Sequence, residues 1–158
     1  MTEDEDISRE RMRVESDVEN QTTEVIRLGL VVAEFNSSVT TEMETTAEET
    51  AADRDAMINT TLSIPGVYDA PLAADRLARR DDIDAVAVIG AIVTGDTDHD
   101  QVIGDAVAQR LTDVSLERDI PVTFGVSGPG QSGAEARERI EKGAEAVNAA
   151  VDMVEMLV

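Results

Sequence analysis

Several residue types are absent or scarce in this sequence of 158 residues, and each shortage excludes a class of protein. There is no cysteine, which excludes a disulfide framework, a thiolate zinc site and a cysteine nucleophile. The longest apolar run, residues 85–93, is interrupted by Gly90 and is far shorter than the roughly 20 residues that cross a bilayer. The N-terminus is acidic where a signal peptide would be basic. We therefore expect a cytoplasmic protein that does not enter membranes.

Basic residues are also scarce: 13 Lys and Arg stand against 34 Asp and Glu, giving a formal net charge of −21. This balance argues against nucleic acid and anionic membrane surfaces as partners, because both are bound through basic patches. Lys142 is the only lysine. Such a composition resembles proteins of cells that hold molar salt, because at ~1 M salt the Debye length of about 3 Å screens the self-repulsion of the chain. An ordinary acidic bacterial protein is the alternative.

The chain divides into an extension and one domain. Residues 1–25 are acidic and show no clear apolar period, so we expect a flexible extension ahead of a domain at 26–158. Short apolar runs predict four strands, at residues 28–33, 57–64, 85–93 and 121–126. Apolar residues at helical spacing predict helices at 39–51, 71–79, 103–114 and from Ser132 onward, with Gly143 as a possible break.

Strand and helix alternate with short links, which is the pattern of a parallel sheet with right-handed crossovers and helices on both faces. We therefore predict an α/β fold, a flavodoxin-like three-layer αβα sandwich with a four-stranded parallel sheet. In such sheets, ligands bind at the carboxyl ends of the strands.

The few aromatic residues and the only histidine cluster near these predicted strand ends: Phe35, Tyr68, His99 and Phe124. Taken singly, the phenylalanines would cap the core, the tyrosine would cover the next helix and the histidine would be a solvated loop residue. Their convergence on one edge of the sheet favours a pocket that stacks a planar ring and transfers protons.

Three sharper motifs fail when tested. Residues 96–100 begin like a calcium loop, but Gln101 and Val107 occupy the positions that need Gly and Glu, so only a looser Mg²⁺ site remains open. Residues 128–133 match G-x-G-x-x-G, but no later strand supplies the acid that a dinucleotide requires. Residues 125–129 lack the last glycine of a serine-hydrolase elbow.

Four segments occur in an order that is specific to one family: residues 31–36, 65–73, 90–99 and 125–130, the last followed by Glu138-Arg139. They strongly resemble 6,7-dimethyl-8-ribityllumazine synthase, and the last resembles its archaeal branch. The resemblance runs from about Leu28 to the C-terminus and omits the acidic extension.

The resemblance implies a step of riboflavin biosynthesis. The family condenses 5-amino-6-(D-ribitylamino)uracil with 3,4-dihydroxy-2-butanone 4-phosphate and releases phosphate and water, with no cofactor and no metal. An amine adds to a ketone, phosphate is eliminated and a ring closes. These steps need proton transfers and two oriented substrates.

The resemblance also implies the role of each matching residue. His99 corresponds to the proton-transfer histidine, and Phe35, beside Asn36, to the residue that stacks on the pyrimidine. The ribityl chain would be gripped by Val67, Tyr68 and Asp69, and the uracil edge would be read by the backbone of Ala91, Ile92 and Val93.

The phosphate end follows in the same way. The butanone phosphate would lie at Asp96 and Thr97 and pair with Arg139, while Phe124 would reach into the site of a neighbouring subunit. Two departures from the family pattern stand out. Asp69 replaces the commoner Glu, and the chain is shorter between Phe124 and Lys142, so Lys142 is an alternative to Arg139 as the phosphate partner.

Members of the family place the site between subunits, so we expect a homo-oligomer, a pentamer or an assembly of pentamers such as an icosahedral capsid. Two other functions remain as alternatives. One is an archaeal-type riboflavin synthase, and the other is a non-catalytic flavin-binding or shell protein of the same fold.

Overall fold

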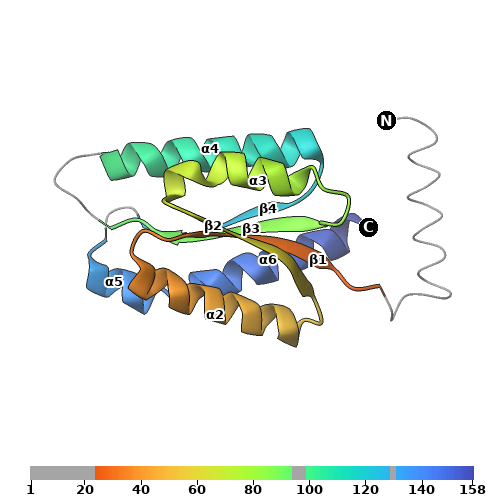
Figure 1. Ribbon diagram of the computed structural model, residues 1–158, viewed down its shortest axis with the longest axis horizontal. Coiled ribbons are helices and arrows are strands. Elements are labelled where there is room, and N and C mark those ends of the chain that lie inside the picture. The colour runs from red at the N-terminus through yellow and green to blue at the C-terminus, as the bar shows by residue number, and fades with distance from the viewer. Residues whose placement is uncertain (1–23, 94–98, 129–130) are drawn as a thin grey trace.

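A computed structural model describes residues 24–93, 99–128 and 131–158. Figure 1 shows strands alternating with helices along these ranges. The elements are β1 (Arg27–Ala33), α2 (Ser37–Asp53), β2 (Met57–Ile64), the 3-10 turn η2 (Val67–Asp69), α3 (Ala70–Ala78), β3 (Ala85–Ala91), α4 (His99–Arg118), β4 (Val122–Ser127), α5 (Gly133–Glu138) and α6 (Lys142–Leu157).

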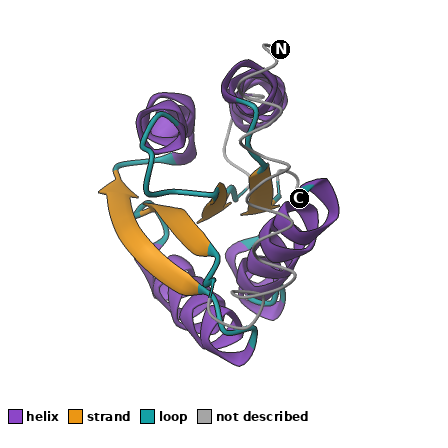
Figure 2. Cartoon of the chain, turned by 90° about the vertical axis from the view of Figure 1, so that its right-hand side faces the viewer, coloured by secondary structure: helices purple, strands orange, loops and turns teal. Residues whose placement is uncertain are grey.

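The four strands form one parallel sheet in the order β2-β1-β3-β4. Helices α3 and α4 cover one face, and α2, α5 and α6 cover the other, so that the molecule has three layers (Figures 1 and 2). The predicted αβα sandwich with a four-stranded parallel sheet is confirmed. The strands end together at what we call the carboxyl edge, formed by Ala33, Ile64, Ala91 and Ser127.

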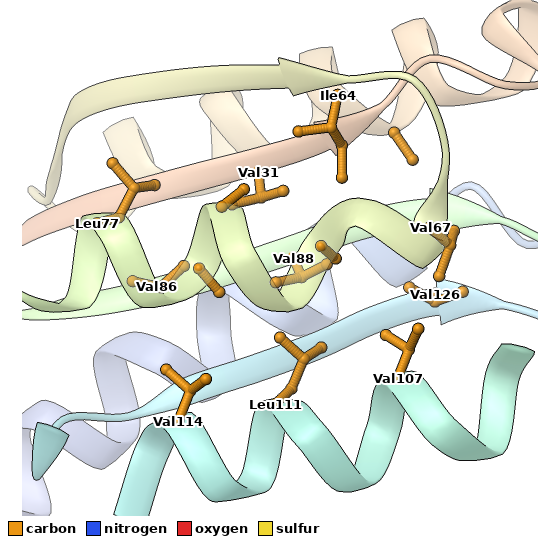
Figure 3. Close-up of a cluster of buried hydrophobic side chains, with 14 of the residues drawn as sticks. Val31, Ile64, Val67, Leu77, Val86, Val88, Val107, Leu111, Val114 and Val126 are labelled. Atoms are coloured by element: carbon orange, nitrogen blue, oxygen red, sulfur yellow. The ribbon is translucent and has the colours of Figure 1, made fainter. Parts of the chain in front are cut away.

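The core lies on both faces of the two central strands, because successive strand residues point in opposite directions. In β3, Val86 and Val88 pack under α3 and α4, where they join Leu77 and Leu111 (Figure 3). On the other face, Leu28, Leu30, Ala87 and Ile89 pack against α2 and α6. Strand β3 is buried at every position because helices cover both faces of the sheet, and burying each of its large apolar side chains contributes roughly 1.5–3 kcal/mol.

Helix α2 carries the narrow apolar stripe predicted for residues 39–51: Val39, Met43, Ala47 and Ala51 are all buried. The predicted break at Gly143 is wrong. The last helical region divides earlier, between Glu138 and Lys142, and Gly143 lies inside α6. Its missing side chain serves packing, because a Cβ there would lie 2.4 Å from the carbonyl oxygen of Met43 in α2.

Strand β3 also ends earlier than predicted, at Ala91 instead of Val93. The last registered pair between β3 and its neighbour β4 is Ala91 opposite Ser127. No helix among the described residues has the length and apolar character needed to cross a membrane.

Candidate functional site

The end of β1 presents an aromatic ring to solvent at the carboxyl edge. Backbone pairing with the next strand continues past β1, since Glu34 and Phe35 donate N–H groups to the carbonyl oxygens of Ile64 and Pro65 at 2.8 and 3.1 Å. This pairing fixes the backbone of Phe35 while its side chain remains 65% exposed. The ring therefore contributes little to the core and most of its surface is open to contact.

Asn36 joins the end of β1 to the end of β3. It takes a left-handed backbone conformation, φ 67°, that asparagine tolerates better than most residues. It is the N-cap residue of α2, yet its side chain makes no capping hydrogen bond. Instead, its Nδ2 donates to the carbonyl oxygen of Ala91 at 3.1 Å. Asn36 therefore ties the start of α2 to the end of β3.

The turn η2 packs beside the same strand end. Val67 is buried, and a Cβ added at Gly90 would meet its Cγ2 at 2.9 Å, so any larger residue there would force Val67 to shift. Tyr68, the next residue, is 71% exposed. The carboxylate of Asp69 accepts the N–H of Gly66 at 3.2 Å, which holds the turn closed.

Ala91, the last residue of β3, and Ile92, the next residue, are buried, and Val93 is half-buried. The N–H of Ile92 donates to the carbonyl oxygen of Ser127 at 2.7 Å. Pairing between the third and fourth strands thus continues one residue beyond β3 itself. The backbone of this segment is held from both sides, by β4 and by Asn36.

Helix α4 begins at His99, which is exposed, and the helix packs against η2. The only histidine therefore starts the helix that contacts the turn carrying Tyr68. The predicted phosphate residues Asp96 and Thr97 lie outside the described residues, as does most of the segment considered for Mg²⁺. Within the described ranges, no group of His, Asp and Glu side chains is arranged to hold a metal ion.

Phe124 does not lie at the carboxyl edge, and the expectation that all four residues gather there is wrong for it. It pairs with Val88 in the middle of β4, three positions before Ser127. The reason is the register of β4 on β3, which pairs three further residues after Phe124, up to Ser127 opposite Ala91. Phe124 remains 39% exposed on this edge strand.

Arg139 ends the short helix α5, which the predicted capping box starts: Ser132 Oγ accepts the N–H of Glu135 at 3.2 Å. The guanidinium Nη1 donates to Oε1 of Gln131 at 3.0 Å, and Nη2 lies 3.9 Å from the carboxylate of Glu135. Hydrogen bonds from the Ser132 backbone and hydroxyl hold the pKa of Glu135 below its ordinary value, so this carboxylate stays charged.

Sequence reasoning missed Gln131, whose side chain is 1% exposed and contacts both Ile92 and Arg139. It stands directly before the capping box at a variable position of the G-x-G-x-x-G match, where neither the pattern nor an apolar period specifies the residue type. The described site thus links Asn36, the end of β3, Gln131 and Arg139 through hydrogen bonds. An exposed ring, an exposed histidine and a guanidinium at one edge suit acid–base chemistry on a planar, anionic substrate.

Comparison with known proteins identifies the family. A sequence model of the 6,7-dimethyl-8-ribityllumazine synthase family matches residues 25–158. The 6,7-dimethyl-8-ribityllumazine synthase of Halobacterium salinarum is 74% identical over 131 residues, covering 83% of this chain and 98% of the relative. That of Halorubrum lacusprofundi is 68% identical over 133 residues, covering 84% and 99%. That of Methanocaldococcus jannaschii is 44% identical over 133 residues, covering 84% and 94%. The chain therefore belongs to the 6,7-dimethyl-8-ribityllumazine synthase family.

Proposed function

We propose that this protein condenses 5-amino-6-(D-ribitylamino)uracil with 3,4-dihydroxy-2-butanone 4-phosphate. The products are 6,7-dimethyl-8-ribityllumazine, phosphate and water. The observation that carries the proposal is the family match over residues 25–158, which includes every residue assigned to the site. The reaction is assigned to residues 26–158, and residues 1–25 form an acidic extension of the catalytic domain.

The uracil substrate binds at the end of β3. The backbone of Ala91, Ile92 and Val93 reads its polar edge, and Phe35 stacks on its ring. Two observations support this assignment: the segment is pinned by Asn36 and Ser127, and the Phe35 ring is exposed beside it. The ribityl chain lies along Val67, Tyr68 and Asp69.

The butanone phosphate binds at Asp96, Thr97 and Arg139. The carboxylate of Asp96 would repel a phosphate, so a guanidinium is needed to offset it. The alternative cation, Lys142, is paired with Glu145 one turn along α6, at 3.2 Å. The backbone of Lys142 also lies against Gly125, two residues before the end of β4. Both observations favour Arg139 as the residue that binds the phosphate.

The chemistry needs only proton transfers between oriented substrates. The amine of the uracil attacks the ketone and a first water leaves to give an imine, phosphate is then eliminated, and ring closure by the ribitylamino nitrogen on the remaining carbonyl expels a second water. These additions and eliminations involve no net oxidation. His99 moves protons between the substrates, and much of the rate comes from holding the two substrates together.

The protein works as a homo-oligomer, a pentamer or an assembly of pentamers, in a salt-rich cytoplasm. The position of Phe124 supports assembly, because its large ring is 39% exposed on an edge strand and is available for contact with another subunit. The charge of −21 per chain means that subunits would repel one another in dilute buffer. Sedimentation in dilute buffer and in ~3 M KCl tests both points, since salt should favour the assembled form.

The decisive experiment mixes the purified protein with both substrates in ~3 M KCl and follows lumazine absorbance and fluorescence. Formation faster than the spontaneous condensation supports the synthase. No acceleration by folded protein would overturn it. In that case, supplying lumazine alone would test for the riboflavin synthase reaction.

A further inference from the structure

Gln131 is a buried polar residue for which neither the fold nor the proposed chemistry has so far required a role. Among the described residues, three polar side chains are fully buried: Thr40, Ser127 and Gln131. Burying an amide is costly unless its polar atoms are hydrogen-bonded. The partners of Gln131 therefore show what the residue is placed to do.

The Gln131 amide joins three separate parts of the site. Its Nε2 donates to the carbonyl oxygen of Ile92 at 3.2 Å. Its Oε1 accepts from the Ser127 hydroxyl at 2.7 Å and from Nη1 of Arg139 at 3.0 Å. The orientation of the amide is determined by these partners, since a flipped amide would point its N–H groups at the guanidinium donor.

The close approach of the Gln131 amide to Ile92 requires a glycine at position 128. Gly128 has φ +92°, and a Cβ there would lie 2.1 Å from the Ile92 carbonyl oxygen and 3.0 Å from Nε2 of Gln131. Gly128, directly after β4, therefore lies close against the carbonyl that the glutamine binds.

We propose that Gln131 is a positioning residue that sets Arg139 at a fixed place relative to the end of β3. This inference rests on the proposed function, in which Ile92 belongs to the uracil site and Arg139 binds the phosphate. One amide then ties the two substrate sites together. The distance between the uracil amine and the butanone ketone therefore depends on the hydrogen bonds of Gln131 to Ile92 and Arg139.

A neutral partner suits this role better than a carboxylate. A carboxylate would neutralise the guanidinium, whereas an amide oxygen orients it and leaves its full charge for the phosphate. The other nearby acceptor, Glu135, is 3.9 Å away, and about half of each side chain is exposed. Salt screens such an exposed pair strongly, but it has little effect on a hydrogen bond to a buried amide.

The test is a double-mutant cycle between Gln131→Met and Arg139→Ala, measured as KM for each substrate and kcat. Methionine keeps the length of the side chain but makes none of the hydrogen bonds. In the wild-type background, we expect Gln131→Met to raise KM for the butanone phosphate roughly tenfold, as for loss of a hydrogen bond to a charged group. In the Arg139→Ala background, it should change that KM less than about twofold.

The matched control is Asn59→Leu. Asn59 donates from a side-chain amide to the carbonyl oxygen of Asp82 at 2.9 Å, the same kind of bond at the opposite edge of the sheet. We expect this change to leave both KM values unchanged. Circular dichroism and melting curves establish that each variant is folded. Should Gln131→Met not fold, Gln131→Asn keeps a buried amide but shortens its reach by one methylene, and the same pattern is expected.

The results separate two failures. Wild-type protein that does not accelerate lumazine formation overturns the proposed function and this inference with it. Active wild-type protein whose folded Gln131 variant keeps the wild-type KM for the butanone phosphate overturns only the positioning role. Equal losses in the wild-type and Arg139→Ala backgrounds also overturn it, because they would show that Gln131 does not act through Arg139.

Discussion

Replacing Gly143 with alanine tests how closely α6 packs against α2. The added methyl group would lie 2.4 Å from the carbonyl oxygen of Met43, 3.1 Å from its carbonyl carbon and 3.3 Å from its Cα. All three are backbone atoms in the interior of the 17-residue helix α2. They cannot rotate away as the end of a side chain would, so one helix must move.

The expected cost follows from two opposing effects. Alanine is a better helix former than glycine, which stabilises the folded state by at most about 1 kcal/mol. Overpacking against an unyielding backbone costs about 1–3 kcal/mol, and more where buried neighbours separate. Met43, Val147 and Ala150 belong to the cluster that would be pushed apart. Because the neighbouring atoms are backbone, we place the overpacking cost at the upper end of this range and expect a net loss of about 1–2 kcal/mol, which corresponds to a melting temperature lower by roughly 2–8 °C.

Thermal unfolding followed by circular dichroism in ~3 M KCl, at one protein concentration, measures this loss. Gly133→Ala is the matched control, because Gly133 begins α5 and an added Cβ would have nothing within 4 Å. The control should melt at the wild-type temperature or slightly above it. A Gly143→Ala variant as stable as the wild type would refute the close approach of α2 and α6.

Four further changes probe the site and the surface. His99→Ala should lower kcat about tenfold or more with little change in either KM, since it removes proton transfer but not binding. Phe35→Ala should raise KM for the uracil roughly tenfold through lost stacking, without lowering the melting temperature, because the ring is 65% exposed. Arg139→Ala should raise KM for the butanone phosphate far more than KM for the uracil, and equal effects would contradict its role. A hydrogen bond from Arg118 lowers the pKa of Asp75 in the folded protein below its ordinary value of 3.8. The charged carboxylate therefore stabilises the fold at any pH above 3.8, and this contribution is lost as the pH falls through the pKa of the folded state. Asp75→Asn should therefore lower the free energy of unfolding, measured in urea and dilute salt, by less than about 1 kcal/mol at neutral pH. It should have no effect at a pH below the pKa of Asp75 in the folded protein.

Much of the fold was predictable because its signals are local. The stripe at Val39, Met43, Ala47 and Ala51 identifies α2 from spacing alone, and the continuous apolar run of β3 identifies a strand buried on both faces. The capping box at Ser132 correctly marks the start of α5. Each of these depends on neighbours within a few residues, which a sequence displays directly.

The errors arose where distant segments decide the outcome. Gly143 is a helix breaker by local preference, but Met43, a hundred residues earlier, needs the space. Phe124 was expected at the carboxyl edge, but its register against Val88 places it in the middle of β4. The end of a strand depends on how far the neighbouring strand continues to pair with it, and that strand lies far away in the sequence.

The sequence by itself determined the parallel αβα fold, the acidic surface and the family, because periodicity, charge and ordered motifs are properties of the chain. Only the tertiary structure decided how the site is held together. The hydrogen bonds of Asn36 to Ala91 and of Gln131 to Ile92 and Arg139 join segments separated by 8–55 positions. Such bonds form because the parallel strands end at the same edge of the sheet. No spacing in the sequence predicts that the amide of Gln131 lies between the ends of β3 and β4.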